Sequence, residues 1–289
     1  MSDARLLNAR ALVSACLLAA FVSAASAQRD DATIDVTEVA DGVYMLTGPG
    51  GNVGLSVGDD GAFLIDDKFA PLSEKILAAV GSVTDKPVRF LINTHHHGDH
   101  TGGNENIAAG GAVIVAHENV RVRLSDGPAG ALPVVTFPDA LTFHQNGDDI
   151  DVFHVANAHT DGDGIVHFRN ANVIHMGDTF FSGRYPFIDV GSGGSIAGAI
   201  AAVDEVATLI DDDTQIIPGH GPLSGPDDLR RYRAVLTTCR DRVQALIDDG
   251  KTREEAVAAT PNADYDDEWG GGFISPERWV ESLYDSLTQ

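Results

Sequence analysis

The sequence NTHHHGDHTGGN, residues 93–104, places four histidines and one aspartate within six consecutive positions, 95–100. Directly before the cluster, the mostly apolar run PVRFLINTH, residues 87–95, predicts a buried strand that leads into it. Such a cluster is either a metal site or a polar loop that is rich in histidine. A metal site needs further ligands from distant parts of the chain. The first interpretation therefore requires a fold that brings several strand ends together.

The rest of the chain alternates short strands with helices, in the same order twice. In the first half we expect strands at 33–40, 43–48, 53–58, 61–66, 87–95 and 112–117, with helices at 71–83 and 118–124. In the second half we expect strands at 140–145, 149–155, 164–169, 172–177 and 214–219, with helices at 196–210, 226–249 and 275–288. This order predicts a single α/β domain, an αββα sandwich of two mixed β-sheets packed face to face with helices outside.

The N-terminus reads as a targeting segment. Arg5 and Arg10 precede the apolar run ALVSACLLAAFVSA, and the small residues ASA precede Gln28. This is the order of a secretory signal peptide, which predicts cleavage after Ala27. We therefore expect residues 1–27 to be removed and residues 28–289 to form one domain of a periplasmic or secreted protein.

The chain is strongly acidic, with 43 acidic and 19 basic residues and a net charge of −24. A surface of this kind repels phosphate backbones and anionic lipids, so we expect neither nucleic acid nor membrane partners but a small-molecule substrate. Loss of residues 1–27 would leave Cys239 as the only cysteine. This excludes an intrachain disulfide and a cysteine-ligated zinc cluster in the processed chain. Cys239 lies in a predicted helix, where we expect a buried small apolar side chain.

Three further histidine or aspartate residues follow or end predicted strands: His159 in NAHTDGD, Asp178 in HMGDTF and His220 in PGHG. Each stands near glycine or another small residue, which lets the backbone turn sharply or approach closely. In α/β folds, ligands gather at strand ends because the loops converge there. Imidazole nitrogens and carboxylate oxygens suit a cation such as Zn²⁺. The four sites together favour a metal centre over a polar loop.

The spacing within the first cluster predicts two metal positions. Side chains alternate in an extended segment, so His95 and His97 should point the same way and His96 elsewhere. After Gly98 the chain turns, and the next two residues, Asp99 and His100, can then reach a second point nearby.

This pattern resembles the metallo-β-lactamase fold superfamily, whose signature is His-x-His-x-Asp-His after a strand, then a lone His, an Asp or Cys, and a last His. The resemblance covers nearly all of residues 28–289. It implies two zinc ions per chain, although iron or manganese is not excluded. The implied ligands are His95, His97 and His159 for the first ion, Asp99, His100 and His220 for the second, and Asp178 as the bridge.

The residue type at position 178 helps to predict the class of substrate. The best-known β-lactamase subclass has Cys at this position, and Asp in GDTFF looks more like the glyoxalase II type of thioester hydrolase and the metallo-lactonases. The expected export favours a β-lactam, because such antibiotics act in the periplasm. The leading expectation is therefore a β-lactamase in which metal-bound hydroxide attacks the carbonyl. The alternative is a lactone or thioester hydrolase. Asp99 and Asp178 are the candidate catalytic residues, because their charge would help to hold the metals and orient the hydroxide.

The sequence is also compatible with two other classes of protein. The same fold hosts oxidoreductases with a di-iron centre, and carboxylate-rich ligation suits iron. Those enzymes usually carry a flavin domain, for which the sequence offers no candidate. A non-catalytic zinc protein would have a closed ligand shell, whereas the glycines beside these ligands suggest an open one.

Several residues near the ligands have secondary roles to test. Asp161 and Asp163 are candidates for orienting His159. The segment 180–193 directly follows Asp178 and is either a connector or a wall of the substrate pocket. In the second case Arg184 and Tyr185 are the candidate substrate contacts.

Overall fold

The structure is a computed structural model that describes residues 32–289. The expected signal peptide, residues 1–27, lies outside the described residues and stays a prediction. Within residues 32–289, no helix combines the length and apolar character that a membrane crossing requires.

The first sheet has seven strands in sequence order. They are β1 (Asp35–Ala40), β2 (Val43–Thr47), β3 (Val53–Gly58), β4 (Gly61–Ile65), β5 (Val88–Asn93), β6 (Val113–His117) and β7 (Val135–Phe137). The first four are antiparallel neighbours, and the pairs from β4 to β7 are parallel. The helix α2 (Ser73–Val83) connects β4 to β5. The sheet is mixed, as predicted.

The second sheet has five strands in the order β12-β11-β10-β9-β8. They are β8 (Ala140–Gln145), β9 (Asp148–His154), β10 (Gly164–Phe168), β11 (Val173–His175) and β12 (Gln215–Ile217). Only β11 and β12 are parallel, since α6 (Ile196–Ala207) lies between them in the chain. This sheet is therefore also mixed.

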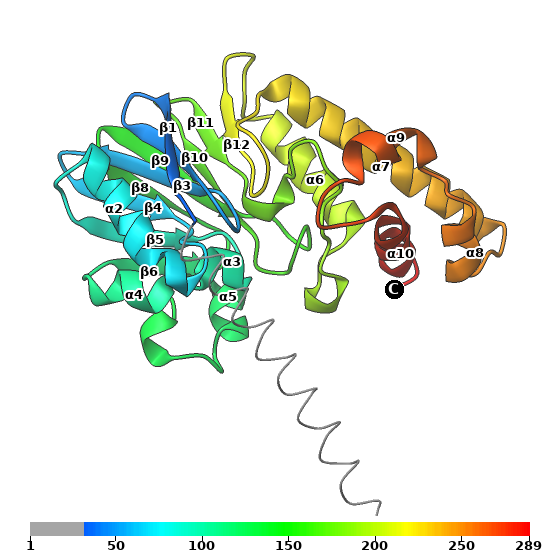
Figure 1. Cartoon of the computed structure of the whole chain (residues 1–289), viewed down its shortest axis with the longest axis horizontal. Helices are drawn as coiled ribbons and strands as arrows, with labels where there is room; N and C mark the ends of the chain where they lie inside the picture. Colours follow the sequence, from blue (N-terminus) through cyan, green and yellow to red (C-terminus); the bar gives the residue numbers. More distant parts are fainter. Residues whose placement is uncertain (1–31) are drawn as a thin grey trace, which may run out of the picture.

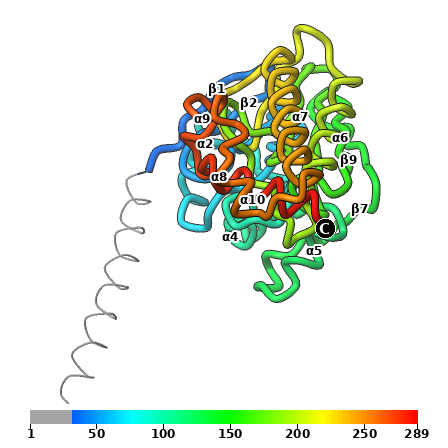
Figure 2. The backbone as a smooth tube through the Cα atoms, turned by 90° about the vertical axis from the view of Figure 1, so that its right-hand side faces the viewer, coloured from blue at the N-terminus to red at the C-terminus, as the bar shows by residue number. Residues whose placement is uncertain are grey.

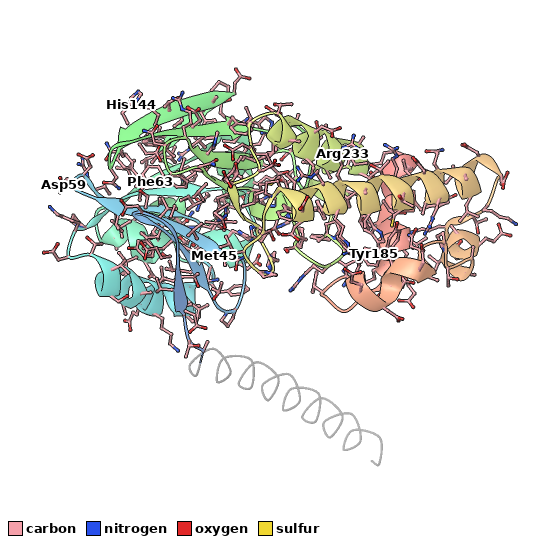
Figure 3. All side chains as sticks on the ribbon, turned by 90° about the horizontal axis from the view of Figure 1, so that it is seen from above. Met45, Asp59, Phe63, His144, Tyr185 and Arg233 are labelled. Carbon is pink, nitrogen blue, oxygen red and sulfur yellow. The ribbon has the colours of Figure 1, made fainter. Side chains whose placement is uncertain are left out.

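The two sheets pack face to face through an apolar layer that includes Met45 and Phe63, both labelled in Figure 3. Phe63 of β4 meets Phe143 of β8 edge to face, with ring centroids 4.8 Å apart. On the outer face of the first sheet, Ile76 and Val80 of α2 are buried. On the outer face of the second sheet, Ile165 and Ile174 share a core with Ala199 and Val203 of α6. In Figure 1 the strands of both sheets lie to the left and the C-terminal helices to the right. The predicted αββα sandwich is confirmed.

The C-terminal helices form the outer layer beside the second sheet (Figure 2). They are α6, α7 (Pro226–Asp248), α8 (Arg253–Ala258), α9 (Ala263–Trp269) and α10 (Pro276–Leu287). Proline in the first turn starts α7 and α10, where its missing N–H costs nothing. Trp279 of α10 and Leu236 of α7 are fully buried in the shared core.

Apart from the 3-10 turns, the elements that were not predicted are β7, α8, α9, α4 (Asn104–Ala109) and α3 (Gly98–Thr101). Each has seven residues or fewer, too short for an apolar period to stand out. Cys239 is free and fully buried in α7, which confirms the sequence prediction.

Candidate metal centre

Seven side chains from four strand ends meet at one edge of the sandwich. The turn after β5 supplies His95 and His97, and the short helix α3 (Gly98–Thr101) that follows supplies Asp99 and His100. The loop between β9 and β10 supplies His159. A 3-10 turn after β11, η3 (Gly177–Thr179), supplies Asp178, and the loop after β12 supplies His220. These residues form two groups, each with ligand atoms within 4.8 Å of one another.

The first group contains His95, His97, His159 and Asp178. Nε2 of His159 lies 2.9 Å from Nδ1 of His97. The Oδ2 atom of Asp178 lies 3.5 Å from Nε2 of His159 and 3.8 Å from Nε2 of His95. Three imidazole nitrogens and one carboxylate oxygen thus face a common point.

The second group contains Asp99, His100 and His220. Nε2 of His220 lies 3.3 Å from Oδ2 of Asp99 and 3.5 Å from Nε2 of His100. The other carboxylate oxygen of Asp178, Oδ1, lies 3.1 Å from His100 Nε2 and 3.4 Å from His220 Nε2. Asp178 therefore presents one oxygen to each group, which is the position that a bridging ligand needs.

Two of the histidine rings contact a carboxylate through the nitrogen that faces away from the group. Asp66 Oδ2 lies 2.7 Å from Nδ1 of His100, and Asp189 Oδ2 lies 3.0 Å from Nε2 of His97. A carboxylate partner keeps the proton on the nitrogen that faces it. The other nitrogen, which faces the group, is then free to bind a cation.

Neutral oxygens hold two further rings. The backbone carbonyl of Phe187 accepts a 2.7 Å hydrogen bond from Nδ1 of His159. The hydroxyl of Thr94 lies 3.1 Å from Nδ1 of His95. In both residues Nε2 is therefore the nitrogen that is turned toward the first group.

The two groups differ in their protonation without a cation. Burial lowers the pKa of His95 well below its usual range and the pKa of His159 to about 4. Burial also opposes the charge of the other two rings, but their acidic partners together outweigh it. Asp178 and Asp66 raise the pKa of His100, and Asp178 and Asp99 raise that of His220 to about 9. A cation that enters the second group must therefore displace protons.

The two acidic residues of the groups are ionised. Burial opposes the charge of Asp178, but the charges of His100 and His220 hold its pKa well below the usual range. Burial also opposes the charge of Asp99, and its hydrogen bond with His220 lowers its pKa nevertheless. The centre therefore carries two buried or half-buried negative charges.

Two buried atoms show that a cation fits this centre. Nε2 of His95 and Oδ1 of Asp178 have no hydrogen-bond partner within residues 32–289. An unsatisfied buried polar atom costs about 1–3 kcal/mol, so these positions suit a non-protein partner. The donor set of nitrogens and oxygens without a thiolate suits zinc and does not exclude iron or manganese.

Two glycines allow the close approaches that the centre requires. A Cβ on Gly219 would lie 2.1 Å from Oδ1 of Asp178, and a Cβ on Gly51 would lie 2.1 Å from the ring of His100. Real Cβ atoms never come so close to a neighbour. Only glycine permits the backbone to pass at these two points.

The structure also locates the residues that the sequence analysis placed around the ligands: His96, Asp161 and Asp163. His96 belongs to neither group, and one of its ring nitrogens lies within 4.8 Å of ligand atoms of His97 and Asp189. Asp163 contacts His159, but through the backbone: its Oδ2 accepts a 2.6 Å hydrogen bond from the His159 amide. Asp161 does not contact the His159 ring. Its carboxylate instead forms a two-point ion pair with Arg123 of α5 (Glu118–Arg123), which fixes the loop against that helix.

Three buried or half-buried residues were missed by the sequence analysis: Asp66, Lys68 and Asp189. Asp66 and Lys68 follow β4 and have positive φ angles of 64° and 59°. The sequence IDDK does not predict this left-handed backbone conformation. Lys68 is fully buried, and its ammonium donates to the carbonyl of Gly51. Burial lowers its pKa to about 8.

A cavity of about 490 Å³ opens above the centre. This is within the range of small-molecule sites, ~300–1,000 Å³. Both predicted substrate contacts, Arg184 and Tyr185, line it. The hydroxyl of Tyr185 is engaged in a 2.8 Å hydrogen bond to Asp266. Tyr185 lies among the C-terminal helices, at the end of the molecule opposite Asp59 (Figure 3).

The chain is similar to several characterised proteins over part of its length. It is 30% identical over 132 residues to the 2,4-dinitroanisole O-demethylase subunit alpha of Nocardioides sp., which covers 44% of this chain and 40% of that protein. It is 28% identical over 159 residues to a hydroxyacylglutathione hydrolase of Polaromonas sp., covering 52% and 55%. The chain therefore matches only about half the length of these relatives.

Among solved structures, the fold is similar to a metallo-beta-lactamase from Pontibacter korlensis. The TM-score is 0.62 at 20% identity, and the match covers 71% of this chain and 99% of that one. At this identity the likeness concerns the fold alone.

The family itself is shown by a match to a family model. The model of the metallo-beta-lactamase superfamily matches residues 46–220, a range that contains all seven candidate ligands. Because this range is more than half of the chain, the protein belongs to the metallo-beta-lactamase superfamily.

Proposed function

We propose that this protein is a hydrolase that binds two zinc ions and cleaves an ester, thioester or lactone at its carbonyl carbon. The superfamily is hydrolytic, and the chain has a histidine and aspartate cluster that could hold metal. The observation that carries the proposal is the position of Asp178, with one carboxylate oxygen toward each group. When bound, two zinc ions at these groups would activate water near neutral pH and polarise a carbonyl oxygen.

The residues of the chain prepare the site for this chemistry. His95, His97 and His159 each turn one ring nitrogen toward the first group, because the other nitrogen lies against a protein oxygen. Asp99 and Asp178 would supply negative charge that balances a pair of dications. Both also line the cavity, which supports a role for them beside a bound substrate. No serine or cysteine nucleophile is needed.

The choice of bond rests on two features. The first is the carboxylate at the bridging position, which resembles enzymes of the glyoxalase II type. The proteins that this chain matches over part of its length also include hydroxyacylglutathione hydrolases. Among the described residues that line the cavity, Arg184 is the one arginine or lysine, and the histidines there, His97 and His220, are candidate metal ligands. Away from the metal centre, Arg184 is therefore the available partner for an anionic group of a substrate.

β-Lactam hydrolysis is the second candidate. It is favoured by the expected export and by the Asp-His-His composition of the second group. A β-lactam carries a carboxylate, for which Arg184 is the available partner. The proposal therefore includes a periplasmic or secreted location for the processed chain.

One panel of substrates tests these alternatives. The zinc-loaded protein is assayed on p-nitrophenyl esters, γ-lactones, an acyl thioester and nitrocefin, before and after treatment with EDTA. We expect ester, thioester or lactone hydrolysis that EDTA abolishes and zinc restores. Nitrocefin turnover that exceeds all the others would favour the β-lactam alternative. Full activity in metal-free protein would reject the proposal.

The variant Arg184→Ala separates the two candidates further. A β-lactam that uses Arg184 for its carboxylate should lose about tenfold or more in kcat/KM. An uncharged ester should be affected much less, because it has no carboxylate to bind.

A further inference from the structure

Phe273 is the most exposed large apolar side chain within residues 32–289, at 74%. An isolated apolar side chain on a surface needs no special explanation. Phe273, however, lines the cavity above the metal centre, together with its neighbour Ile274. It lies between α9 and α10, directly after the three glycines 270–272.

Aromatic contacts lead from Phe273 to the first ligand group. Its ring meets Phe187 edge to face, with centroids 6.3 Å apart and an interplanar angle of 86°. Phe187 in turn lies 5.8 Å from the ring of His97 and 5.7 Å from that of His159. Phe273 is therefore the outer end of an aromatic wall that begins at the candidate metal ligands.

Besides Phe187, the Phe273 ring contacts Arg278. The guanidinium carbon of Arg278, in the first turn of α10, lies 5.0 Å from the ring centroid. Such a cation–π contact is attractive and holds the ring in place. Since the ring is still 74% exposed, most of its apolar surface is available to another molecule.

The chemistry of the cavity selects the kind of group that would cover this ring. Beside Phe273 the cavity is lined by the apolar side chains of Phe187 and Ile274, whereas Asp99 and Asp178 line it at the candidate metal centre. A carboxylate laid against Phe187 and Ile274 would lose its water without gaining a polar partner from them. An aliphatic or aromatic substituent would bury its own surface and that of the wall.

We propose that Phe273 is a specificity-determining residue that receives the apolar acyl chain of the substrate. The carbonyl would lie at the candidate metal centre, and the chain would run along Phe187 to the rim. This inference rests on the proposed ester, thioester or lactone hydrolysis, and it names the substrate class: carbonyl compounds with an uncharged, medium-length acyl group.

The first test compares acyl chain lengths. kcat/KM is measured for p-nitrophenyl acetate, butyrate and octanoate with the zinc-loaded full chain, its variant Phe273→Ala and the control Val134→Ala. Val134 is 70% exposed and does not line the cavity. Each methylene that becomes buried strengthens binding about fourfold, so we expect the wild type to favour octanoate over acetate by about tenfold or more. Phe273→Ala should reduce this ratio to about threefold or less, and Val134→Ala should keep it.

The second test does not depend on turnover. The Kd values of acetate and octanoate, the acids that such esters release, are measured by calorimetry on the same three proteins. In Phe273→Ala we expect an octanoate Kd at least about fivefold weaker, with a much smaller change for acetate. Equal octanoate Kd values in wild type and Phe273→Ala, or equal losses for both acids, would overturn the inference. If the wild type hydrolyses no ester of any length, the proposed function fails, and the octanoate Kd still decides the role of Phe273.

Discussion

The carboxylate of Asp66 lies 2.7 Å from Nδ1 of His100, and both side chains are almost completely buried. Asp66 also accepts hydrogen bonds from the backbone amide and the hydroxyl of Thr94, at 2.8 and 2.7 Å. One acid at the end of β4 therefore fixes both the start of the histidine cluster and the orientation of its last ring. Asp66 is a positioning residue for the second metal group.

Replacing Asp66 should weaken metal binding. Asp66→Ala removes the partner that keeps the proton of His100 on Nδ1, and we expect zinc affinity to fall by roughly 10- to 100-fold. Competition with a chromophoric chelator measures the affinity. The control Asp227→Ala removes a carboxylate that is 96% exposed and should change nothing. Wild-type affinity in Asp66→Ala would show that His100 is oriented by other contacts.

Gly219 should be irreplaceable. The Cβ of Gly219→Ala would overlap with Oδ1 of Asp178 and lie 2.5 Å from the carbonyl carbon of Gly177, so Asp178 must move. We expect a loss of at least about 10-fold in zinc affinity, because a displaced bridging oxygen can serve neither group well. Metal content after dialysis and the unfolding midpoint in denaturant report this change.

The matched control for that substitution is Gly81→Ala in α2, where a Cβ meets nothing within 4 Å. It should stabilise the protein by up to about 1 kcal/mol, since alanine favours a helix more than glycine does. If Gly219→Ala bound zinc as tightly as Gly81→Ala, the close packing at Asp178 would not matter for the centre.

Metal removal should destabilise the protein as well as inactivate it. In the second group, nearby carboxylates raise the pKa of His100 and of His220, so both rings bind protons when no cation is present. A zinc ion would displace these protons and bind the same nitrogens more strongly. Zinc at 1,000 times its Kd adds about 4 kcal/mol per site, which corresponds to a rise in Tm of roughly 10 °C. Calorimetry with zinc and with EDTA, together with a metal analysis that we expect to give two zinc ions per chain, checks this. Identical Tm values would contradict a preformed site.

The thiol of Cys239 should be unreactive in the folded protein. Burial raises its pKa to about 11, so at pH 8 very little thiolate exists, and the side chain is inaccessible to reagents. We expect no reaction with a thiol-specific chromogenic reagent in native buffer and one reactive thiol in denaturant, for a chain of residues 28–289. Rapid labelling of the native form would mean that α7 opens locally.

The meeting of the candidate ligand residues was predictable because each lies near a strand end, next to glycine or a small residue. His159, Asp178 and His220 are separated from the first cluster by about 60 to 120 positions, yet the order of strands and helices already predicted a common edge. Asp161 and Asp163 show the limit of this reasoning. The sequence places both near His159, but the turn directs Asp163 to the His159 amide and Asp161 to Arg123 of α5.

The sequence by itself determined the order of elements, the αββα class and the residue types that stand at each strand end. Those properties depend on local periodicity and turn residues, which act over a few positions. Only the tertiary structure decided that Asp66 faces His100, that Asp178 lies between two groups, and that Phe273 reaches the rim of the cavity. These relationships join segments that are not neighbours in sequence; Asp66 and His100, for example, are 34 residues apart. They follow from how the sheets and the C-terminal helices pack together, which no local pattern encodes.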